Sequence, residues 1–460
     1  MVQSQSKVVT TAVIGTGHFA TAVVTQAESI AELSVPAVVD IDVEAAHLAY
    51  ERAGVDPANV AICESRAAAL AAMARRQRVI LPDASLLMDL PIDVVVESTG
   101  VPEAGARHAL AAIAHGKHVV MVSKEPDVVV GPILAQRARA AGVVYTPTAG
   151  DQHGLLIELV EWARRLGLEV LCGGKARDAE FVYDVDARTV ACGRHSIAPS
   201  ADEWPWLRPI PAGGAAEFVA GRQAALAKLP QVGGFDLVEM AIAANYTGLL
   251  PDVAATHTPA LHIAELPEVF CPLEMGGILR QPGVIDCVTC LRQPHEAGMG
   301  GGVFIVVACA NDYSRHILHT KGLIANSSGT AAVIYRPYHL CGVETPTSIL
   351  HAGQLGMGIT AKLPTPRVDV VAQVRRAMHT GERVGNDHSP DLLALMQPAV
   401  GVGDANPLPL HMANGNSLQK DVGAGSLIAA NSVAEPDGSV LWSLRREQDA
   451  YFLRIANGEL

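Results

Sequence analysis

Apolar residues in the first third of the chain occur in short β-branched runs, and each run is followed by a longer stretch of helical period. The runs at 8–14, 92–97 and 118–122 have the length of buried strands, and "PEAGARHALAAIAHGK" reads as a helix that ends at a glycine. Strands and helices that alternate in this way indicate a doubly wound parallel sheet of the Rossmann type. We therefore predict a dinucleotide-binding domain at residues 1–150.

The pattern changes beyond residue 150. Residues 151–362 mix strand-like runs such as "LEVLCGGKA" with helices such as "DLVEMAIAANYTG", which predicts an α+β substrate domain. Residues 363–460 contain many short turns, little helical pattern and two segments that echo each other, "VVAQVRRAMHTGERV" and "NSLQKDVGAGSLIAANSV". The predicted fold class is α/β, with a small β-rich unit at the C-terminus.

The turn after the first predicted strand has the spacing G-x-G-x-x-A, formed by Gly15, Gly17 and Ala20. Gly15 permits a tight turn, Gly17 lets a pyrophosphate approach the backbone, and Ala20 lets the next helix pack closely on the sheet. The free N–H groups of that helix then point at the phosphates. The motif alone is equally consistent with an ordinary strand-to-helix turn. The cofactor-binding residues predicted here are Gly15, Thr16, Gly17, His18 and Phe19.

Asp40, at the end of the next strand, strengthens the prediction of a cofactor site. A carboxylate at this spacing hydrogen-bonds the adenosine ribose and repels a 2′-phosphate, so that NAD is favoured over NADP. The alternative is a solvated acid at a strand end. Because ligands bind at the carboxyl ends of parallel strands, we also place Ser98, Thr99, Gly100 and Ser123 in the cofactor crevice.

Composition narrows the range of partners. The net charge of -13 and the absence of a basic stripe argue against nucleic acid or an anionic membrane, and 49% hydrophobic residues indicate a packed globular protein. No apolar run approaches the ~20 residues of a membrane span, and "MVQSQSK" leads straight into the first strand without a signal peptide. The eight cysteines sit mostly singly in apolar runs, which suits a reducing cytoplasm.

Nothing in the spacing of cysteines or histidines indicates a metal site. Cys287 and Cys290 form a C-x-x-C without a second pair at zinc-ligand spacing, and the 17 histidines form neither H-x-x-x-H nor H-E-x-x-H. We therefore predict no catalytic metal, although a divalent ion would suit a phosphorylated ketose substrate.

Hydride transfer to a carbonyl needs a cation or donor at the oxygen where negative charge develops. Lys175, in "CGGKARD", is the first candidate, because burial in a glycine-rich strand end would lower its pKa into a useful range. The alternative is a solvated surface lysine. Lys124, in "VSKEPD", is the second candidate, with simple pairing to Glu125 as its alternative.

The densest rigid polar cluster of the predicted substrate domain is "YRPYHL". Since proline fixes the backbone within it, Arg336 can hold a phosphate or carboxylate through two hydrogen bonds, and Tyr338 or His339 can donate to a substrate oxygen. Three further residues are candidates for substrate contacts. Asn245 ends a predicted helix, where the alternative is a cap, and Asp151 and His153 lie where the first domain passes into the second, a usual place for a ligand.

Three long stretches, "PIDVVVESTGVPEAGARHALAAIAHGKHVVM", "VEMAIAANYTGLLPD" and "YRPYHLCGVETP", resemble the homoserine-dehydrogenase-like oxidoreductases that carry a C-terminal SAF (β-clip) domain. That group includes a second type of 1-deoxy-D-xylulose 5-phosphate reductoisomerase. The resemblance, spread over residues 8–380, implies an oligomeric NAD(P)-dependent oxidoreductase with a SAF-like domain at 363–460. Lys124 is similar to the strand-end lysine of homoserine dehydrogenases. Reductoisomerases of this kind resemble NADPH users, whereas Asp40 favours NAD.

We therefore expect an NAD(P)-dependent oxidoreductase, with a reductoisomerase as one form of it. Its expected substrate is a small polyhydroxylated carbonyl compound or alcohol, with or without a phosphate or carboxylate. One alternative is a non-redox lyase or epimerase in which tightly bound NAD accepts a hydride transiently. Another is a regulatory nucleotide-sensing protein without turnover. We expect a homodimer formed through the substrate domain.

Overall fold

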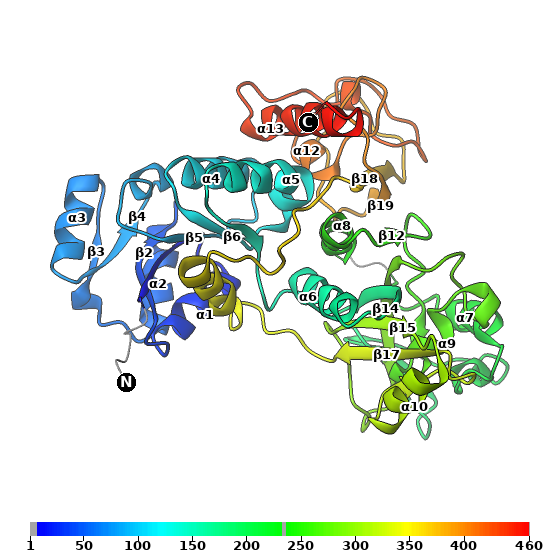
Figure 1. Ribbon diagram of the computed structural model, residues 1–460. Coiled ribbons are helices and arrows are strands. Elements are labelled where there is room, and N and C mark those ends of the chain that lie inside the picture. Colours follow the sequence, from blue (N-terminus) through cyan, green and yellow to red (C-terminus); the bar gives the residue numbers. More distant parts are fainter. Residues whose placement is uncertain (1–6, 232–235, 460) are drawn as a thin grey trace, which may run out of the picture.

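The computed structural model describes residues 7–231 and 236–459. Figure 1 shows two lobes that each contain a sheet. The C-terminal part of the chain, by which we mean the residues from 363 onwards, lies beside both of them. The first lobe holds the N-terminal residues, and the second begins after residue 150.

The first lobe contains a parallel sheet of seven strands in the order β3-β4-β2-β1-β5-β6-β7. Its strands are β1 (Val9–Ile14), β2 (Leu33–Val39), β3 (Val60–Ile62), β4 (Arg78–Leu81), β5 (Val94–Glu97), β6 (His118–Met121) and β7 (Tyr145–Pro147). Its helices are α1 (His18–Ala27), α2 (Val43–Arg52), α3 (Arg66–Ala74), α4 (Pro102–Ala114) and α5 (Lys124–Ala140). The order reverses at β1, which pairs with β2 on one side and β5 on the other. The predicted doubly wound parallel sheet is confirmed.

Packing on both faces explains the unbroken β-branched runs of these strands. Val94 and Val96 belong to one hydrophobic cluster and Val95 to another, because successive side chains of a strand point to opposite faces. Helices cover both faces, and small residues such as the fully buried Ala20 allow α1 to lie close to the sheet. Ligands of such sheets bind at the carboxyl ends of the strands where the order reverses, here between β1 and β5.

The second lobe contains a mixed sheet of ten strands. Its strands are β8 (Val170–Ala176), β9 (Phe181–Asp184), β10 (Thr189–Cys192), β11 (His195–Ile197), β12 (Leu250–Pro251), β13 (Ala260–Leu261), β14 (Val284–Arg292), β15 (Val303–Ala308), β16 (Ile324–Ala325) and β17 (Ala331–Arg336). Its helices are α6 (Gln152–Arg165), α7 (Ala215–Ala225), α8 (Asp236–Thr247), α9 (Leu266–Val269) and α10 (Asp312–Thr320). The central strand β8 pairs in parallel with β14 and antiparallel with β15. Helices α6 and α8 pack against this centre and against each other.

The chain then returns to the first lobe. Helix α11 (Thr345–Leu350) packs on α1 and β1, so that Ile349 and Ala352 share a hydrophobic cluster with Val13 and Ala20. The remaining elements are β18 (Val368–Val374), β19 (Leu392–Pro398), α12 (Leu410–Ala413) and α13 (Val440–Ala456). Strands β18 and β19 form an antiparallel pair. The two segments that echo each other in sequence also face each other, through the bridges Gln373–Leu427, Met378–Val422 and Arg383–Ser417.

Helix α13 corrects the expectation of little helix in the last hundred residues. It is 17 residues long and packs on α4 and α5 of the first lobe (Figure 1). The Glu103 carboxylate of α4 accepts hydrogen bonds from the Ser439 hydroxyl and from the first backbone N–H groups of α13. Arg445 forms a buried bidentate ion pair with Asp369 of β18 (2.7 Å for each contact). The C-terminal part is therefore fixed to the first lobe rather than hanging from it.

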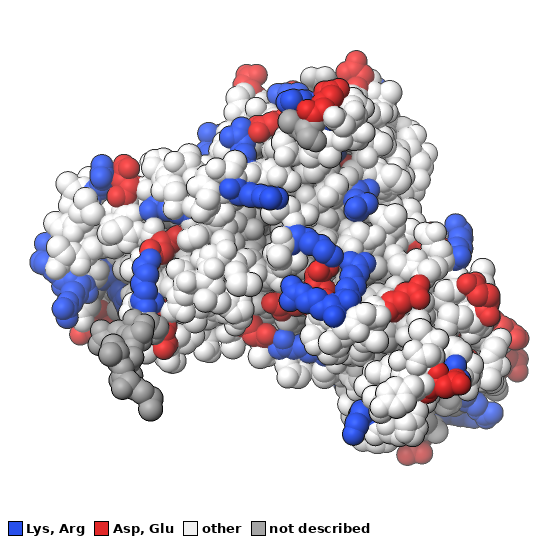
Figure 2. Space-filling model, in the orientation of Figure 1, with Lys and Arg blue, Asp and Glu red and all other residues white. Residues whose placement is uncertain are grey.

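Charged side chains are spread thinly over one face of the molecule (Figure 2). On the face shown in Figure 2, basic and acidic side chains lie singly or in small groups on a mostly uncharged surface. Within residues 7–231 and 236–459, no helix has both the length and the apolar character to cross a lipid bilayer.

Candidate active site

The glycine turn between β1 and α1 has the geometry that a dinucleotide requires. Gly15 has a φ of 87°, and a Cβ at this position would lie 2.7 Å from the carbonyl oxygen of Ser98. Gly17 is the N-cap of α1, and a Cβ there would meet no atom of the described residues within 4 Å. The N-terminus of α1 therefore borders open space, and its first N–H groups can face a pyrophosphate.

Asp40, directly after β2, holds this turn in place. Its carboxylate accepts hydrogen bonds from the Thr16 backbone N–H (2.8 Å), the Thr16 hydroxyl (2.5 Å) and the Asp42 backbone N–H (2.9 Å). A carboxylate has about four acceptor positions, and three are in use. A ribose must therefore share or displace these contacts, and the role of Asp40 in ribose binding stays a prediction.

A cavity of about 180 Å³ lies at the carboxyl ends of β5 and β6. Its lining consists of Phe19, Ser98, Gly100, Val122, Ser123, Lys124, Glu125, Asp151 and Cys341. The structure thus brings four of the predicted cofactor residues together with the predicted catalytic Lys124 and with Asp151. We call this space the cofactor-side cavity. The other six predicted cofactor residues do not line it. Gly15, Thr16, Gly17 and Asp40 belong to the glycine turn, His18 is exposed at the start of α1, and the Thr99 hydroxyl donates to the buried Glu97 (2.6 Å).

Beside this cavity, two lysines converge on one glutamate. Lys124, the first residue of α5, forms an ion pair with Glu239 of α8 and lies 3.3 Å from Asp151. Lys175 of β8 forms an ion pair with the same Glu239 and with Asp236 (2.7 Å). The side chains of Lys175 and Glu239 are each 2% exposed, whereas that of Lys124 is 22% exposed. The structure therefore joins both predicted catalytic lysines through a carboxylate that the sequence analysis did not single out.

Burial and the paired acids act in opposite directions on these lysines. Burial lowers the pKa of Lys175, but Glu239 and Asp236 outweigh it and hold the pKa above its ordinary value. The pKa of Lys124 is raised by the same balance, with Asp151 and Glu239 as the partners that overcome burial. The predicted lowering of the lysine pKa is therefore wrong, because the acids that pair with Lys175 come from a distant helix. Lysines of this kind stay protonated and stabilise negative charge rather than release a proton.

Glu125 is the group of the cofactor-side cavity that titrates near neutrality. Burial raises the pKa of Glu125 to about 7, with Lys124 opposing the rise and Asp387 and Glu97 adding to it. Asp387 belongs to the C-terminal part of the chain and lines a second cavity. Its effect on Glu125 therefore shows that the charges of the second cavity act on the cofactor-side cavity.

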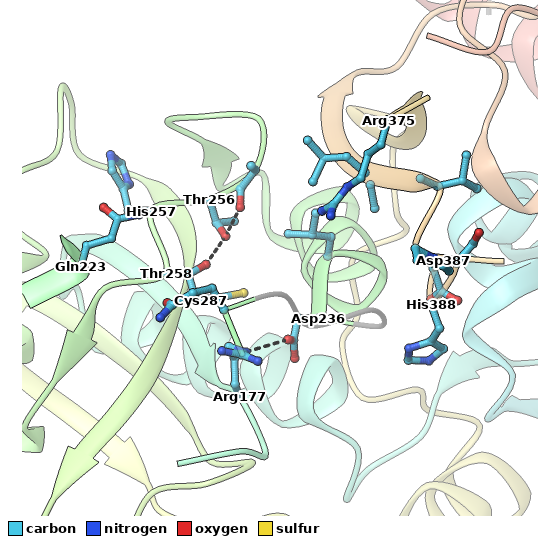
Figure 3. Close-up of a pocket in the computed structure, with 18 residues that line it drawn as sticks. Arg177, Gln223, Asp236, Thr256, His257, Thr258, Cys287, Arg375, Asp387 and His388 are labelled. Carbon is cyan, nitrogen blue, oxygen red and sulfur yellow. Dashed lines mark hydrogen bonds and ion pairs between the residues drawn. The ribbon is translucent and has the colours of Figure 1, made fainter. Parts of the chain in front are cut away.

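The second cavity, of about 390 Å³ (Figure 3), adjoins the lysine cluster at its Lys175 end, because Asp236 belongs to both. Asp236, which pairs with Lys175, lines it, and so does Asp387, on which the charge of Lys124 acts. The polar residues labelled around it are Arg177, Gln223, Asp236, Thr256, His257, Thr258, Cys287, Arg375, Asp387 and His388. We call this space the large cavity, because its volume is about twice that of the cofactor-side cavity. Its walls come from the second lobe on one side and from the C-terminal part of the chain on the other.

The segment Thr256–Thr258 forms a strained wall of the large cavity. Thr256 and Thr258 have φ angles of 59° and 43°, a conformation that costs a β-branched residue about 1–3 kcal/mol. The buried carboxylate of Asp286 stabilises the segment, since it accepts hydrogen bonds from the backbone N–H groups of His257 (2.9 Å) and Thr258 (3.2 Å). It also contacts His257 Nδ1 at 2.6 Å. Burial lowers the pKa of His257, but Asp286 and Asp252 outweigh it, so that the pKa is raised and the imidazole favours the charged form.

Five of the predicted substrate residues line neither cavity: Arg336, Tyr338, His339, Asn245 and His153. The Arg336 guanidinium makes two hydrogen bonds to Glu344 (2.8 and 2.6 Å) and lies over the Tyr338 ring. Tyr338 is 53% exposed, and His339 packs against the glycine at 301. Asn245 is buried and ties the end of α8 to the start of β18, because it bonds the backbone of residues 367 and 368. Asn245 therefore positions β18 relative to α8. The Arg336 guanidinium is already paired with Glu344.

Asp151, His153 and Glu239 offer ligand atoms that lie within 4.8 Å of one another. Both carboxylates are already neutralised, Asp151 by Lys124 and Glu239 by the two lysines. Burial raises the pKa of Asp151, but Lys124 and His153 outweigh it and hold the value at about 2. Burial also lowers the pKa of His153, which sits beside this cluster. We therefore describe the group as part of the ion-pair cluster and assign no metal to it.

Two family models match the chain. The NAD-binding domain of homoserine dehydrogenase matches residues 45–147, within the parallel sheet. The catalytic domain of the oxidoreductase DRL matches residues 232–345, a range that includes Asp236 and Glu239. The glycine turn, Lys175 and the C-terminal part lie outside both matches. No curated protein sequence gives a significant match.

Solved structures with some likeness include three enzymes. A probable dehydrogenase from Thermotoga maritima has 11% identity and a TM-score of 0.31, over 98% of this chain and 90% of that one. Myo-inositol dehydrogenase from Lactobacillus casei, in complex with NAD(H) and myo-inositol, has 16% identity and a TM-score of 0.32, over 65% and 71%. A DOX-P reductoisomerase in complex with magnesium has 13% identity and a TM-score of 0.32, over 53% and 58%. Values this low carry no argument about substrate or mechanism.

The family matches define the protein as an NAD(P)-dependent oxidoreductase. In particular, residues 45–147 match the NAD-binding domain of homoserine dehydrogenase, and residues 232–345 match the catalytic domain of the oxidoreductase DRL. The resemblance seen in the sequence is thereby confirmed for these two parts. The matches favour redox turnover over the alternative of a lyase or epimerase.

Proposed function

We propose that the enzyme oxidises or reduces a small hydroxylated compound that binds between the cofactor-side cavity and the large cavity. The observation that carries this proposal is the Lys124–Glu239–Lys175 bridge, which sets a protonated amine between the cofactor residues of the first lobe and a cavity of substrate size. When bound, the nicotinamide supplies or accepts the hydride.

The two lysines have different tasks in this proposal. Lys124 donates a hydrogen bond to the substrate oxygen and stabilises the negative charge that develops there, because its ammonium is partly exposed in the cofactor-side cavity. Lys175 is a positioning residue, since its buried ammonium holds Glu239, which in turn orients Lys124. Glu125 holds or takes up the exchanged proton near neutral pH.

A substrate screen tests the proposed function. Hydroxy acids, polyols, sugars and their phosphates are offered with NAD or NADP, and the absorbance of the reduced nicotinamide is followed. Turnover with one of these classes supports the proposal. NAD that survives dialysis and cycles without net reduction, while a substrate is dehydrated or epimerised, would instead favour the lyase or epimerase.

The preferred cofactor in this proposal is NAD rather than NADP. The Asp40 carboxylate stands at the end of β2, where its charge opposes a 2′-phosphate, and the exposed Ile41 beside it offers an apolar surface. A hydrogen bond to a charged group contributes about 1.5–3 kcal/mol, which corresponds to at least tenfold tighter binding of NADH than of NADPH. Calorimetric titrations measure both affinities, and tighter NADPH binding would show that Asp40 serves only the glycine turn.

We also propose a homodimer assembled through the second lobe and a SAF-like role for residues 363–460. The antiparallel pairing of the two echo segments supports the β-rich module. Light scattering tests the assembly, since the chain has a mass of 48.1 kDa. A particle of single-chain mass at micromolar concentration would contradict the dimer.

A further inference from the structure

The large cavity lies between the second lobe and the C-terminal part of the chain, and both contribute to its lining. Arg375 follows the last residue of β18, and Asp387 lies in the loop before β19 (Figure 3). The start of β18 is held by Asn245 and by the buried Arg445–Asp369 ion pair. Arg375 therefore projects from an anchored strand, opposite the segment Thr256–Thr258.

The cations of the opposite wall already have partners. Arg177 donates to the carbonyl oxygen of Pro230 (3.1 Å) and to the Thr289 hydroxyl (3.3 Å), and His257 contacts Asp286. These groups supply positive charge to the cavity, and each already has an acidic partner, Asp236 for Arg177 (3.6 Å) and Asp286 for His257 (2.6 Å).

Arg375 differs from them and from its own neighbour. Among the described residues, its guanidinium has neither a hydrogen-bond acceptor nor an ion-pair partner, although it lines the cavity. Arg376, the next residue, lies outside the cavity and pairs with both Asp391 (2.9 Å) and Glu382 (2.9 Å). The two adjacent arginines therefore differ: Arg376 forms ion pairs on the surface of the C-terminal part, whereas Arg375 lines the cavity and its N–H groups remain available to a ligand.

Asp387 supplies the complementary open group. It is 8% exposed, and its Oδ2 atom accepts no hydrogen bond from any residue that the structure describes. A buried acceptor without a partner is costly, so a donor from a ligand fits this position. An anion alone would be repelled by this carboxylate, whereas a hydroxyl group donates to it.

From these observations, and resting on the function proposed above, we propose that the C-terminal part completes the substrate site: Arg375 binds an anionic group of the substrate and Asp387 accepts a hydrogen bond from one of its hydroxyl groups. The substrate class is thus a hydroxylated compound with a phosphate or carboxylate. The planar guanidinium can hold either anion through two hydrogen bonds.

The test uses the full-length protein and needs no turnover. Inorganic phosphate, glycerol 3-phosphate, acetate and glycerate are titrated by calorimetry into the wild type, Arg375→Met, Arg376→Met and Asp387→Leu. The more tightly bound anion pair identifies phosphate or carboxylate as the group recognised. We expect Arg375→Met to weaken that pair about tenfold or more, and the matched control Arg376→Met to leave it within about twofold.

Asp387→Leu separates the two contacts. We expect the wild type to bind the hydroxylated member of the pair about fivefold more tightly than the bare anion, and Asp387→Leu to lose that advantage. The proposal is overturned if neither anion binds the wild type, if Arg375→Met binds like the wild type, or if both arginine variants weaken binding equally. NADH titrations of the same variants keep the two proposals apart, since failure of NADH to bind the wild type argues against the proposed function alone.

Discussion

The cofactor side and the large cavity are built in different ways. The cofactor side uses the carboxyl ends of neighbouring parallel strands, so residues 15–17, 40, 98–100 and 123 meet through the regular order of one sheet. The lining of the large cavity comes from α7, α8, β14, the residue that follows β8 and the C-terminal part, which no single sheet brings together. The first depends on backbone conformation, and the second depends on ion pairs between distant segments. Mutations on the cofactor side should therefore act by changing the backbone conformation, and mutations around the large cavity should act by breaking ion pairs.

The largest effect is expected where the two sides meet. Glu239→Leu removes the carboxylate that Lys124 and Lys175 share and breaks both buried ion pairs, so that Lys124 keeps only Asp151 and Lys175 only Asp236. The free energy of unfolding should therefore fall by about 3–5 kcal/mol. Urea denaturation measures this loss. Glu217→Gln, at an exposed position of α7, is the matched control and should be neutral. Equal stability of the two variants would mean that the bridge contributes nothing to the fold.

The two lysines provide the second test of the comparison. Lys124→Met should lower kcat by about a hundredfold, because it removes the donor that faces the cofactor-side cavity. Lys175→Met should act through Glu239, so it should lower stability as well as kcat. NADH affinity should stay unchanged in both. If Lys175→Met lowers kcat while Lys124→Met does not, the proposed roles are reversed.

The glycine turn sharpens the cofactor half of the comparison. Gly15→Ala should lower stability by about 1–3 kcal/mol, because φ is positive and the new Cβ would meet Ser98. Gly17→Ala should leave the melting temperature unchanged, since its Cβ enters open space, but should weaken NADH binding about tenfold. Thermal melts and calorimetry distinguish the two. Unchanged NADH affinity in Gly17→Ala would remove this turn from the cofactor site.

The effect that is smallest at neutral pH concerns the attachment of the C-terminal part. His411 of α12 is 3% exposed, and burial lowers its pKa from 6.5 to about 4. The stability that its neutral form contributes is complete above pH 6.5, and it is lost as the pH falls towards 4, because only the unfolded chain takes up the proton over that range. His411→Leu should therefore flatten the decline of the urea midpoint between pH 6.5 and 4. Parallel curves for the two proteins would contradict this assignment.

The contrast also explains what could be predicted from the sequence. Strand ends of a parallel sheet converge by topology, so spacing alone placed Ser98 and Ser123 beside Lys124. Glu239 left a weaker signal, because Asp236 and Glu239 are acids three residues apart in the otherwise apolar helix α8. No spacing rule connects that helix to Lys175, and so the sequence suggested a lowered rather than a raised lysine pKa.

Arg336 and Arg375 also show what the sequence could not predict, namely which arginine is already paired within the chain. "YRPYHL" is a dense polar cluster in the sequence, but Glu344, eight residues later, takes up the Arg336 guanidinium. Arg375 stands in an ordinary basic pair, and only the fold shows that its neighbour Arg376 is neutralised while Arg375 faces the large cavity. Local density of polar groups is therefore a poor guide to which of them remain available to a ligand.

The docking of α13 onto α4 and α5 also bears on how the enzyme is made. The parallel sheet is complete in sequence by residue 147, long before the C-terminal part has been synthesised. Strand β18, which leads into the large cavity, is held in place by the ion pair between Asp369 and Arg445 of α13. We therefore expect a nascent chain on the ribosome to acquire its nucleotide site early. It acquires a working substrate site only after α13 has been synthesised and has packed on α4 and α5, which separates cofactor loading from turnover in time.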